Sequence, residues 1–344
     1  MTMNTFGSES LGIILGAGAS HDCGAHVVEA PDKRVPLAKD VLGESFDDVL
    51  CCFPQLDRRK DELRARLAKG ENLEAVLRDF YDSARANQKF WPFQIPLYLR
   101  QLFWAISQDY MHGSTKVDTL MRRTLASAYR RVMFLSLNYD LFLDEAIMGY
   151  ERVHLSDMDS YIAAEKKWIL IKPHGWVDWA RAIDNCPRGG PGEFWPTQLN
   201  DTPHYSAENP SVVMWNRALN VYYRPSYPPG DYMHPQLVIP ADSPKEFACP
   251  AAHIEAARGF HGGCSNLIVI GFSGRDEHIA RLLGFMPDRS HITIVGKGQG
   301  DAKSVMDTIF ARVPDLVPKK FDAEFYDDGF SEFVMSDSFG QQVG

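Results

Sequence analysis

The sequence lacks several features that define specialised protein classes. None of its six cysteines forms a C-x-x-C pair, which argues against a zinc ribbon or a redox dithiol. Its apolar runs, of which residues 267–271 are among the longest, are too short to span a bilayer, so no membrane association is expected. The first residues show no secretory signal pattern. We therefore expect a cytoplasmic protein whose cysteines are buried or free thiols.

Basic clusters and several catalytic motifs are also missing. The formal net charge is −9, and no basic run is longer than residues 58–60, so no direct nucleic-acid partner is expected. The sequence contains neither G-x-x-x-x-G-K-[ST] nor G-x-S-x-G, which excludes P-loop ATP hydrolysis and esterase chemistry of that type. The histidines show no metal-ligand spacing, so neither zinc nor another metal is predicted.

What is present fits a soluble globular protein. Hydrophobic residues make up 45% of the sequence and charged residues 24%. At roughly 150 residues per domain, 344 residues indicate two domains or one large domain with an insert.

Short apolar runs alternate with segments of helical spacing. The runs predict strands at residues 11–15, 132–137, 168–171, 237–240, 267–270, 291–296 and 321–325. Helices are predicted at residues 139–148, 250–260, 276–284 and 302–313, and through much of residues 38–131, where Pro92 and Pro96 are expected to break the helical pattern. Such alternation predicts the α/β class: a Rossmann-like, mostly parallel sheet with helices on both faces, plus a helical insert or small domain.

The same pattern predicts the domain organisation. Residues 1–37 and 132–344 would form a discontinuous domain of Rossmann-like architecture, with an irregular insert at about residues 186–235 that is rich in Pro, Gly, Asn and aromatics. Residues 38–131 would form a helical insert domain, which is a candidate lid and assembly surface.

Polar clusters follow the predicted strands, where α/β sheets bind ligands. Gly16, Ala17, Gly18 and Ser20 come after the first strand and fit a loop that approaches a pyrophosphate; a plain tight turn fits them equally. The third glycine of the dehydrogenase fingerprint is absent, because His21 stands there.

Two further strand ends carry candidate catalytic groups. Asn138 and Asp140 can cap a helix; alternatively, the Asn138 amide contacts a ribose or nicotinamide and Asp140 orients its neighbours. His174 lies between Pro173 and Gly175, and an unperturbed imidazole suits general-base chemistry near neutral pH.

The remaining candidates are weaker. Gly271, Ser273 and Asp276 follow the 267–270 strand, and either Ser273 or Asp276 can cap the next helix or contact a ribose or phosphate. Val295 could shape an adenine pocket. Asp22 could face the nicotinamide, although a surface carboxylate is the alternative. The aromatic run at residues 176–179 is expected to pack in the core.

The order of these polar elements along the chain resembles the sirtuin superfamily. The elements are the glycine loop at residues 16–20, then Asn138 with Asp140, then His174 with Gly175, and then Gly271 with Ser273 and Asp276. The resemblance is closest to its bacterial sirtuin-like, NAD-consuming branch. Protein-deacylating sirtuins also carry two C-x-x-C pairs for zinc, a Pro-Asp-Phe-Arg element and a Phe-Gly-Glu stretch, and the sequence shows none of the three.

This resemblance implies that NAD is the substrate and that the nicotinamide–ribose bond is hydrolysed to ADP-ribose and nicotinamide, as in anti-phage abortive-infection systems. It makes Asn138 and His174 the candidate catalytic residues. The candidate NAD-binding residues are Gly16, Ala17, Gly18, Ser20, Asp22, Asp140, Gly271, Ser273, Asp276 and Val295. An NAD-dependent protein deacylase and a non-catalytic ADP-ribose-binding or NAD-binding scaffold subunit are the alternatives.

An unregulated NAD hydrolase would kill its own cell. We therefore expect activation by homo-oligomerisation or by a separate sensor protein, such as an ATPase, an Argonaute-like protein or a nucleotide-sensing subunit.

Overall fold

The structure of the protein is a computed structural model. It describes residues 10–24, 34–71, 73–86, 94–110, 113–183, 210–212, 214–216, 221–223, 232–237 and 247–343.

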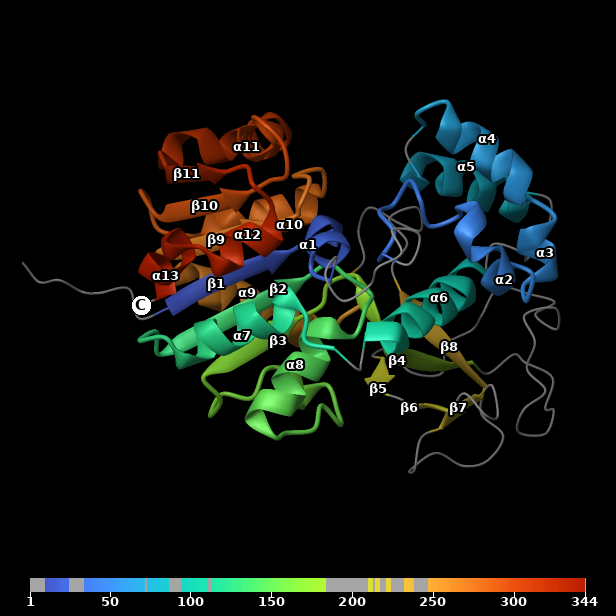
Figure 1. Ribbon diagram of the computed structural model, residues 1–344, viewed down its shortest axis with the longest axis horizontal. Helices are drawn as coiled ribbons and strands as arrows, with labels where there is room; N and C mark the ends of the chain where they lie inside the picture. Colours follow the sequence, from blue (N-terminus) through green and yellow to red (C-terminus); the bar gives the residue numbers. More distant parts are fainter. Residues whose placement is uncertain are drawn as a thin grey trace, which may run out of the picture.

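A six-stranded parallel sheet forms the centre of the larger lobe (Figure 1). Its strands are β1 (Ser10–Leu15), β2 (Arg131–Ser136), β3 (Trp168–Ile171), β9 (Asn266–Ile270), β10 (His291–Val295) and β11 (Asp322–Tyr326). Their spatial order is β11-β10-β9-β1-β2-β3, and every neighbouring pair is parallel. Numbered along the chain within this sheet, the order is 3-2-1-4-5-6, which is the order of the Rossmann fold. The predicted fold class is confirmed, and the order reverses between β1 and β9.

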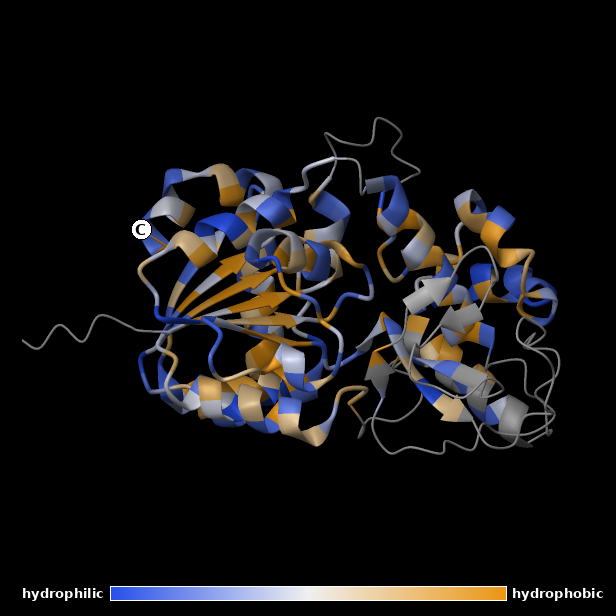
Figure 2. Cartoon of the chain, turned by 90° about the horizontal axis from the view of Figure 1, so that it is seen from below, coloured by the Kyte–Doolittle hydropathy of each residue, from blue (hydrophilic) through white to orange (hydrophobic). Residues whose placement is uncertain are grey.

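Both faces of this sheet are buried, because successive side chains of a strand point to opposite faces. In β1, Leu11, Ile13 and Leu15 belong to one core cluster and Ile14 to the other. Figure 2 shows the resulting apolar strands between two helical layers. Such doubly covered strands give continuous apolar runs, which is why the sequence revealed them.

Helices cover each face of the sheet. The first cluster includes side chains of α1 (Ala17–Asp22), α7 (Lys116–Ala126), α8 (Phe142–Glu151), α12 (Phe330–Met335) and α13 (Asp337–Val343). The second includes side chains of α9 (Ala251–Gly262), α10 (Glu277–Leu282) and α11 (Asp301–Arg312). Short 3-10 helices lie at η2 (Glu44–Phe46), η4 (Asp159–Tyr161), η7 (Leu283–Phe285) and η8 (Pro314–Lys319).

A second lobe lies beyond the carboxyl ends of the strands (Figure 1). Its helices are α2 (Asp47–Leu50), α3 (Pro54–Asp57), α4 (Lys60–Ala68), α5 (Leu73–Ala86) and α6 (Gln94–Tyr110). Its strands are β4 (Gly175–Ile183), β5 (Ser211–Val212) and β8 (Tyr232–Leu237) in an antiparallel sheet, with a ribbon of β6 (Met214–Asn216) and β7 (Val221–Tyr223). Helix α6 packs on β4 and β8.

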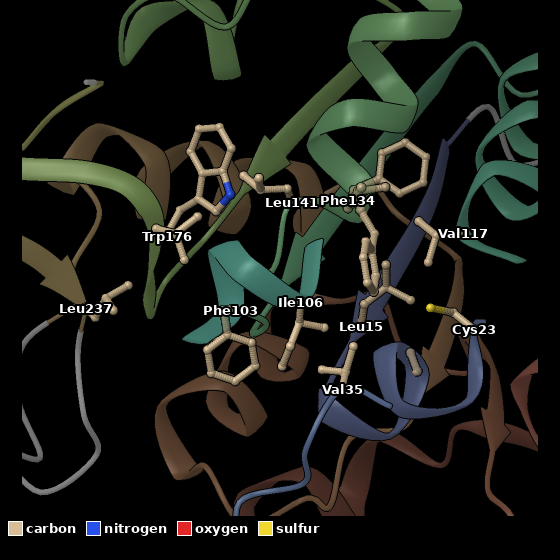
Figure 3. Close-up of a cluster of buried hydrophobic side chains, with 14 of the residues drawn as sticks. Leu15, Cys23, Val35, Phe103, Ile106, Val117, Phe134, Leu141, Trp176 and Leu237 are labelled. Carbon is tan, nitrogen blue, oxygen red and sulfur yellow. The ribbon is translucent and has the colours of Figure 1, made fainter. Parts of the chain in front are cut away.

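The core is continuous between the two lobes. Phe103 and Ile106 of α6 belong to the same cluster as Leu15 of β1 and Phe134 of β2, and Trp176 at the start of β4 joins them (Figure 3). Trp176 and Trp179 are both buried, as expected for core packing.

Two details differ from the sequence-based expectation. Pro96 does not break a helix but lies in the first turn of α6, where proline is tolerated because the missing N–H has no partner there. Helix α8 begins at Phe142 rather than at residue 139; its N-cap is Leu141, and the Asp140 carboxylate accepts a hydrogen bond from the N–H of Phe142 at the entry to the helix. Pro92, residues 238–240 and most of the irregular insert lie outside the described residues. The domain boundaries stay a prediction.

None of the helices in the described part of the chain has both the length and the apolar character that crossing a membrane requires.

Candidate functional site

A cavity of about 690 Å³ lies between the carboxyl ends of the parallel strands and the helical part of the second lobe. Its volume falls in the range typical of small-molecule sites. Leu42, Leu77, Leu99 and Phe103 form an apolar wall on the helical side. The sheet side is polar. Eleven of the twelve predicted site residues line it: Gly16, Ala17, Gly18, Ser20, Asn138, Asp140, His174, Gly271, Ser273, Asp276 and Val295.

The glycines bring the β1 and β9 loops into direct contact. The N–H of Gly16 donates to Ile270 O at 2.9 Å, and the N–H of Gly18 donates to Gly271 O at 3.1 Å. A Cβ on Gly16 would lie 2.5 Å from Gly271 O, and Gly271 itself has a φ of +62°. These two N–H groups are therefore engaged within the protein. The glycines are required by the contact between the loops, and any phosphate contact must come from other groups.

Asn138 lies in a hydrogen-bonded chain beside the glycine loop. Its Nδ2 donates to Ser20 Oγ at 2.7 Å and to Gly16 O at 3.1 Å. Ser20 Oγ donates in turn to Asp140 Oδ2 at 2.6 Å. Asn138 is 8% exposed, and its Oδ1 has no hydrogen-bond partner within the described part of the chain. A buried acceptor of this kind is costly unless a ligand or water satisfies it.

Asp140 lies at the entry to α8 and on the cavity wall; its role in a ligand site stays a prediction. Its Oδ1 accepts a hydrogen bond from the N–H of Phe142 at 3.2 Å, at the start of α8, and it also lines the cavity. Burial raises the pKa of Asp140, and this rise is opposed by the Ser20 hydrogen bond and by the charge of Lys172.

The backbone around His174 presents the imidazole to the cavity. The N–H of Gly175 donates to Lys172 O at 3.0 Å and closes a turn, with Pro173 fixing the backbone inside it. Gly175 has a φ of +82°, and a Cβ there would lie 1.9 Å from Gln236 O. Only glycine fits this position, which is tightly packed against β8.

His174 and Asp276 form a pair that the sequence did not reveal. His174 Nε2 lies 2.8 Å from Asp276 Oδ2, while Asp276 Oδ1 accepts from the N–H of Ile279 at 3.0 Å and caps α10. Burial acts to raise the pKa of Asp276, but the hydrogen bond and charge of His174 and the Ile279 N–H outweigh it and lower that pKa. One carboxylate thus starts a helix and holds the imidazole.

Asp22 is the exception among the predicted residues, because the structure does not place it on the cavity. It is buried at the end of α1, where its carboxylate binds Lys297 and accepts from the N–H of Ser331 at 2.9 Å. Burial acts to raise the pKa of Asp22, but these hydrogen bonds and the lysine charge lower it. The expected surface carboxylate is wrong, because Asp22 is buried and α1 directs its side chain towards α12. A contact between Asp22 and nicotinamide stays a prediction.

Sequence reasoning missed two cations on the cavity wall. Arg275 follows β9 and Lys297 follows β10, and both line the cavity. Their positions after predicted strands could have marked them as candidate site residues. Within the described residues, no three His, Cys, Asp or Glu side chains gather in a way that could hold a metal ion.

No family model and no curated protein matches the sequence. Solved structures do match it. One is a mutant Sir2 homologue in complex with 2′-O-acetyl ADP-ribose, at 14% identity and a TM-score of 0.43, covering 98% of this chain and 92% of that chain. A Sir2 homologue–NAD complex has 12% identity and a TM-score of 0.40, with coverages of 98% and 90%. Sir2 bound to an acetylated peptide has 12% identity and a TM-score of 0.39, with coverages of 97% and 94%. The Rossmann-like assignment rests on the strand order of the sheet and not on these likenesses.

Proposed function

We propose that this chain binds NAD in the cavity and hydrolyses its nicotinamide–ribose bond to ADP-ribose and nicotinamide. The observation that carries the proposal is the convergence of Asn138 and the His174–Asp276 pair on one cavity at the reversal point of a Rossmann-type sheet. Ligands of such sheets bind at this point. The motif resemblance described above supports the choice of NAD.

His174 is the proposed general base. If its Nε2–H donates to Asp276, Nδ1 is left as the proton acceptor of a neutral imidazole. The attacking water gives its proton to that nitrogen as its oxygen bonds to the ribose carbon. The nicotinamide leaves with the electron pair of the broken bond, and the proton then passes to solvent.

Asn138 is proposed to orient the ribose or the water. Its Nδ2 is held by Ser20 and Gly16, so the amide plane is fixed and Oδ1 remains able to accept a hydrogen bond. Because the amide is already oriented, no free energy is spent on reorienting it during the reaction.

The Asp276 carboxylate, which lines the cavity together with the cations Arg275 and Lys297, suits a reaction that develops positive charge on a sugar ring. A carboxylate beside an oxocarbenium-like centre stabilises that centre.

Nicotinamide release tests the proposal. Asn138→Ala and His174→Ala should each lower turnover about 100- to 1,000-fold, because each removes a positioned polar group. His154→Ala is the matched control, since His154 is an exposed residue outside the cavity lining and should leave turnover unchanged. Parent-like NAD consumption by both test variants would overturn the assigned roles.

The same assay separates the alternatives. NAD-dependent turnover of an acyl-lysine peptide would identify a deacylase. Binding of ADP-ribose with no NAD loss, even with partners present, would identify a scaffold subunit.

We further propose that the hydrolase is the toxic effector of an anti-phage system and is controlled by oligomerisation or by a sensor protein. Depletion of NAD halts the cell that contains the enzyme, which makes such control necessary. NAD consumption by the purified chain, compared with that of the chain co-expressed with its genomic neighbours, tests this control.

A further inference from the structure

The larger lobe contains a lysine with no exposed surface. Lys172 directly follows β3, two positions before His174, and its side chain is 0% exposed. A buried ammonium is costly unless it is fully paired, so its contacts need a reason. We propose that Lys172 is a positioning residue that fixes the Asn138 loop against the His174 turn. This inference rests on the proposed function.

The side chain of Lys172 reaches the loop that carries Asn138. Its Nζ donates to the carboxylate of Asp144, in the first turn of α8, and lies 3.4 Å from the main-chain oxygen of Asp140. It also lies 4.9 Å from the centre of the Trp176 ring, where the ammonium faces a cation–π partner. Asp144 is itself 0% exposed, so the pair is wholly enclosed.

The backbone of Lys172 belongs to the turn that carries His174. Its carbonyl accepts the Gly175 N–H that closes this turn, and the neighbouring Pro173 carbonyl accepts from the N–H of Ala248 at 2.7 Å. One residue therefore joins both candidate catalytic loops, one through its main chain and the other through its side chain.

Stability does not explain the pair. Replacing a buried ion pair by apolar groups of similar volume is often neutral or stabilising. Asp144 Oδ1 also has no hydrogen-bond partner within the described residues, so the pairing is incomplete. The pair fixes the orientation of the loop that carries Asn138, because the Lys172 ammonium binds the Asp144 carboxylate and the Asp140 main-chain oxygen at the same time.

The test compares Lys172→Met, Asp144→Leu and the double variant. Each single variant leaves one buried charge unpaired and should be less stable than the parent. The double variant should regain parent-like or higher thermal stability. We expect its kcat for nicotinamide release to fall about 10- to 100-fold with KM within about 2-fold, because transition-state positioning is lost and NAD binding is kept. Amide hydrogen exchange across residues 137–142 should be about 10-fold faster.

Lys167→Met is the matched control. Lys167 precedes the same strand at its other end and donates to Leu125 O and Ser127 O at 2.7 Å each. This change should leave both kcat and the exchange of residues 137–142 at parent values.

The outcomes separate a positioning role from a structural one. A double variant that recovers turnover together with stability would show that the pair only supports the fold and would overturn the inference. Unchanged exchange at residues 137–142 would also overturn it. If the parent releases no nicotinamide under any condition, the proposed function fails, while the exchange measurement still decides whether Lys172 holds the loop.

Discussion

At the scale of single residues, the site is built from side chains that serve two partners each. Asp276 caps α10 with one oxygen and holds His174 with the other. Ser20 accepts from Asn138 and donates to Asp140. Replacing any of these residues removes two interactions at once. The replacement must therefore be chosen so that only one of the two is lost.

Asp276→Ser separates the two roles of this carboxylate. Serine and aspartate are about equally good N-caps, so the free energy of unfolding should change by less than about 0.5 kcal/mol. Nicotinamide release should fall about 10- to 100-fold, because serine lacks the carboxylate that faces the imidazole. Urea unfolding and product release, measured on one preparation, check both expectations.

Asp276→Asn is the matched comparison, since it keeps the size and the cap but not the charge. It should be as stable as the parent and should lower nicotinamide release about 10- to 100-fold, because a neutral amide replaces the carboxylate that faces the imidazole. Parent-like turnover in Asp276→Ser would reduce Asp276 to a helix cap.

At the scale of elements, the strands of the parallel sheet could be predicted because both of their faces are buried. Apolar runs such as residues 11–15 and 267–270 can be recognised as strands without knowing which strands pair with them. The glycines after them mark the loops. The helix boundaries were harder. Helix α8 starts after Leu141 and not at residue 139, although the apolar spacing continues through both positions, so spacing alone does not locate its first residue.

Contacts between elements could not be predicted. His174 and Asp276 are 102 positions apart, and Lys172 and Asp144 are 28 apart. Hydrophobic periodicity describes one segment at a time and says nothing about which polar side chains meet. For the same reason the sequence suggested that Asp22 could join the site, whereas α1 carries it towards Lys297 and Ser331.

Strand β4 carries an acidic group whose ionisation should affect stability. Burial raises the pKa of Asp178 to about 7, helped by repulsion from Asp144 and opposed by Arg100. The ordinary value is 3.8, so the folded state favours the protonated form. The stability that this preference contributes is fully present below pH 3.8 and is lost as the pH rises through about 7.

Asp178→Asn isolates this effect, because asparagine is neutral throughout. From about pH 4 to about pH 7 the parent should lose stability relative to the variant, by at most about 1.4 kcal/mol per pH unit. Urea midpoints of both proteins across this range provide the measurement. A constant difference between the two curves would mean that Asp178 ionises normally in the folded protein.

At the scale of the whole molecule, the end of the described chain closes one face of the sheet. Helices α12 and α13 pack on α7, and Arg123 joins them to it. Its Nη1 donates to Val334 O, 211 positions away, and its guanidinium lies 4.9 Å from the centre of the Phe339 ring. This one side chain thus connects the middle of the chain to its last helices.

Arg123→Met should lower the free energy of unfolding by about 1–3 kcal/mol, because it removes a charged hydrogen bond and a cation–π contact. Arg122→Met is the control, since Arg122 is an exposed neighbour on the same helix and should change stability by no more than about 0.5 kcal/mol. Thermal or urea unfolding checks both. Equal effects of the two substitutions would remove the assigned role of Arg123.

The pairing of β1 with β9 has a consequence during synthesis. Leu11 of β1 aligns with Asn266 of β9, so β1 cannot complete its pairing until the ribosome has synthesised β9, much later in the chain. Gly271 and Asp276 arrive later still, and without them the imidazole has no carboxylate beside it. A nascent or prematurely terminated polypeptide that ends before Asp276 therefore holds only part of the cavity and lacks the His174–Asp276 pair.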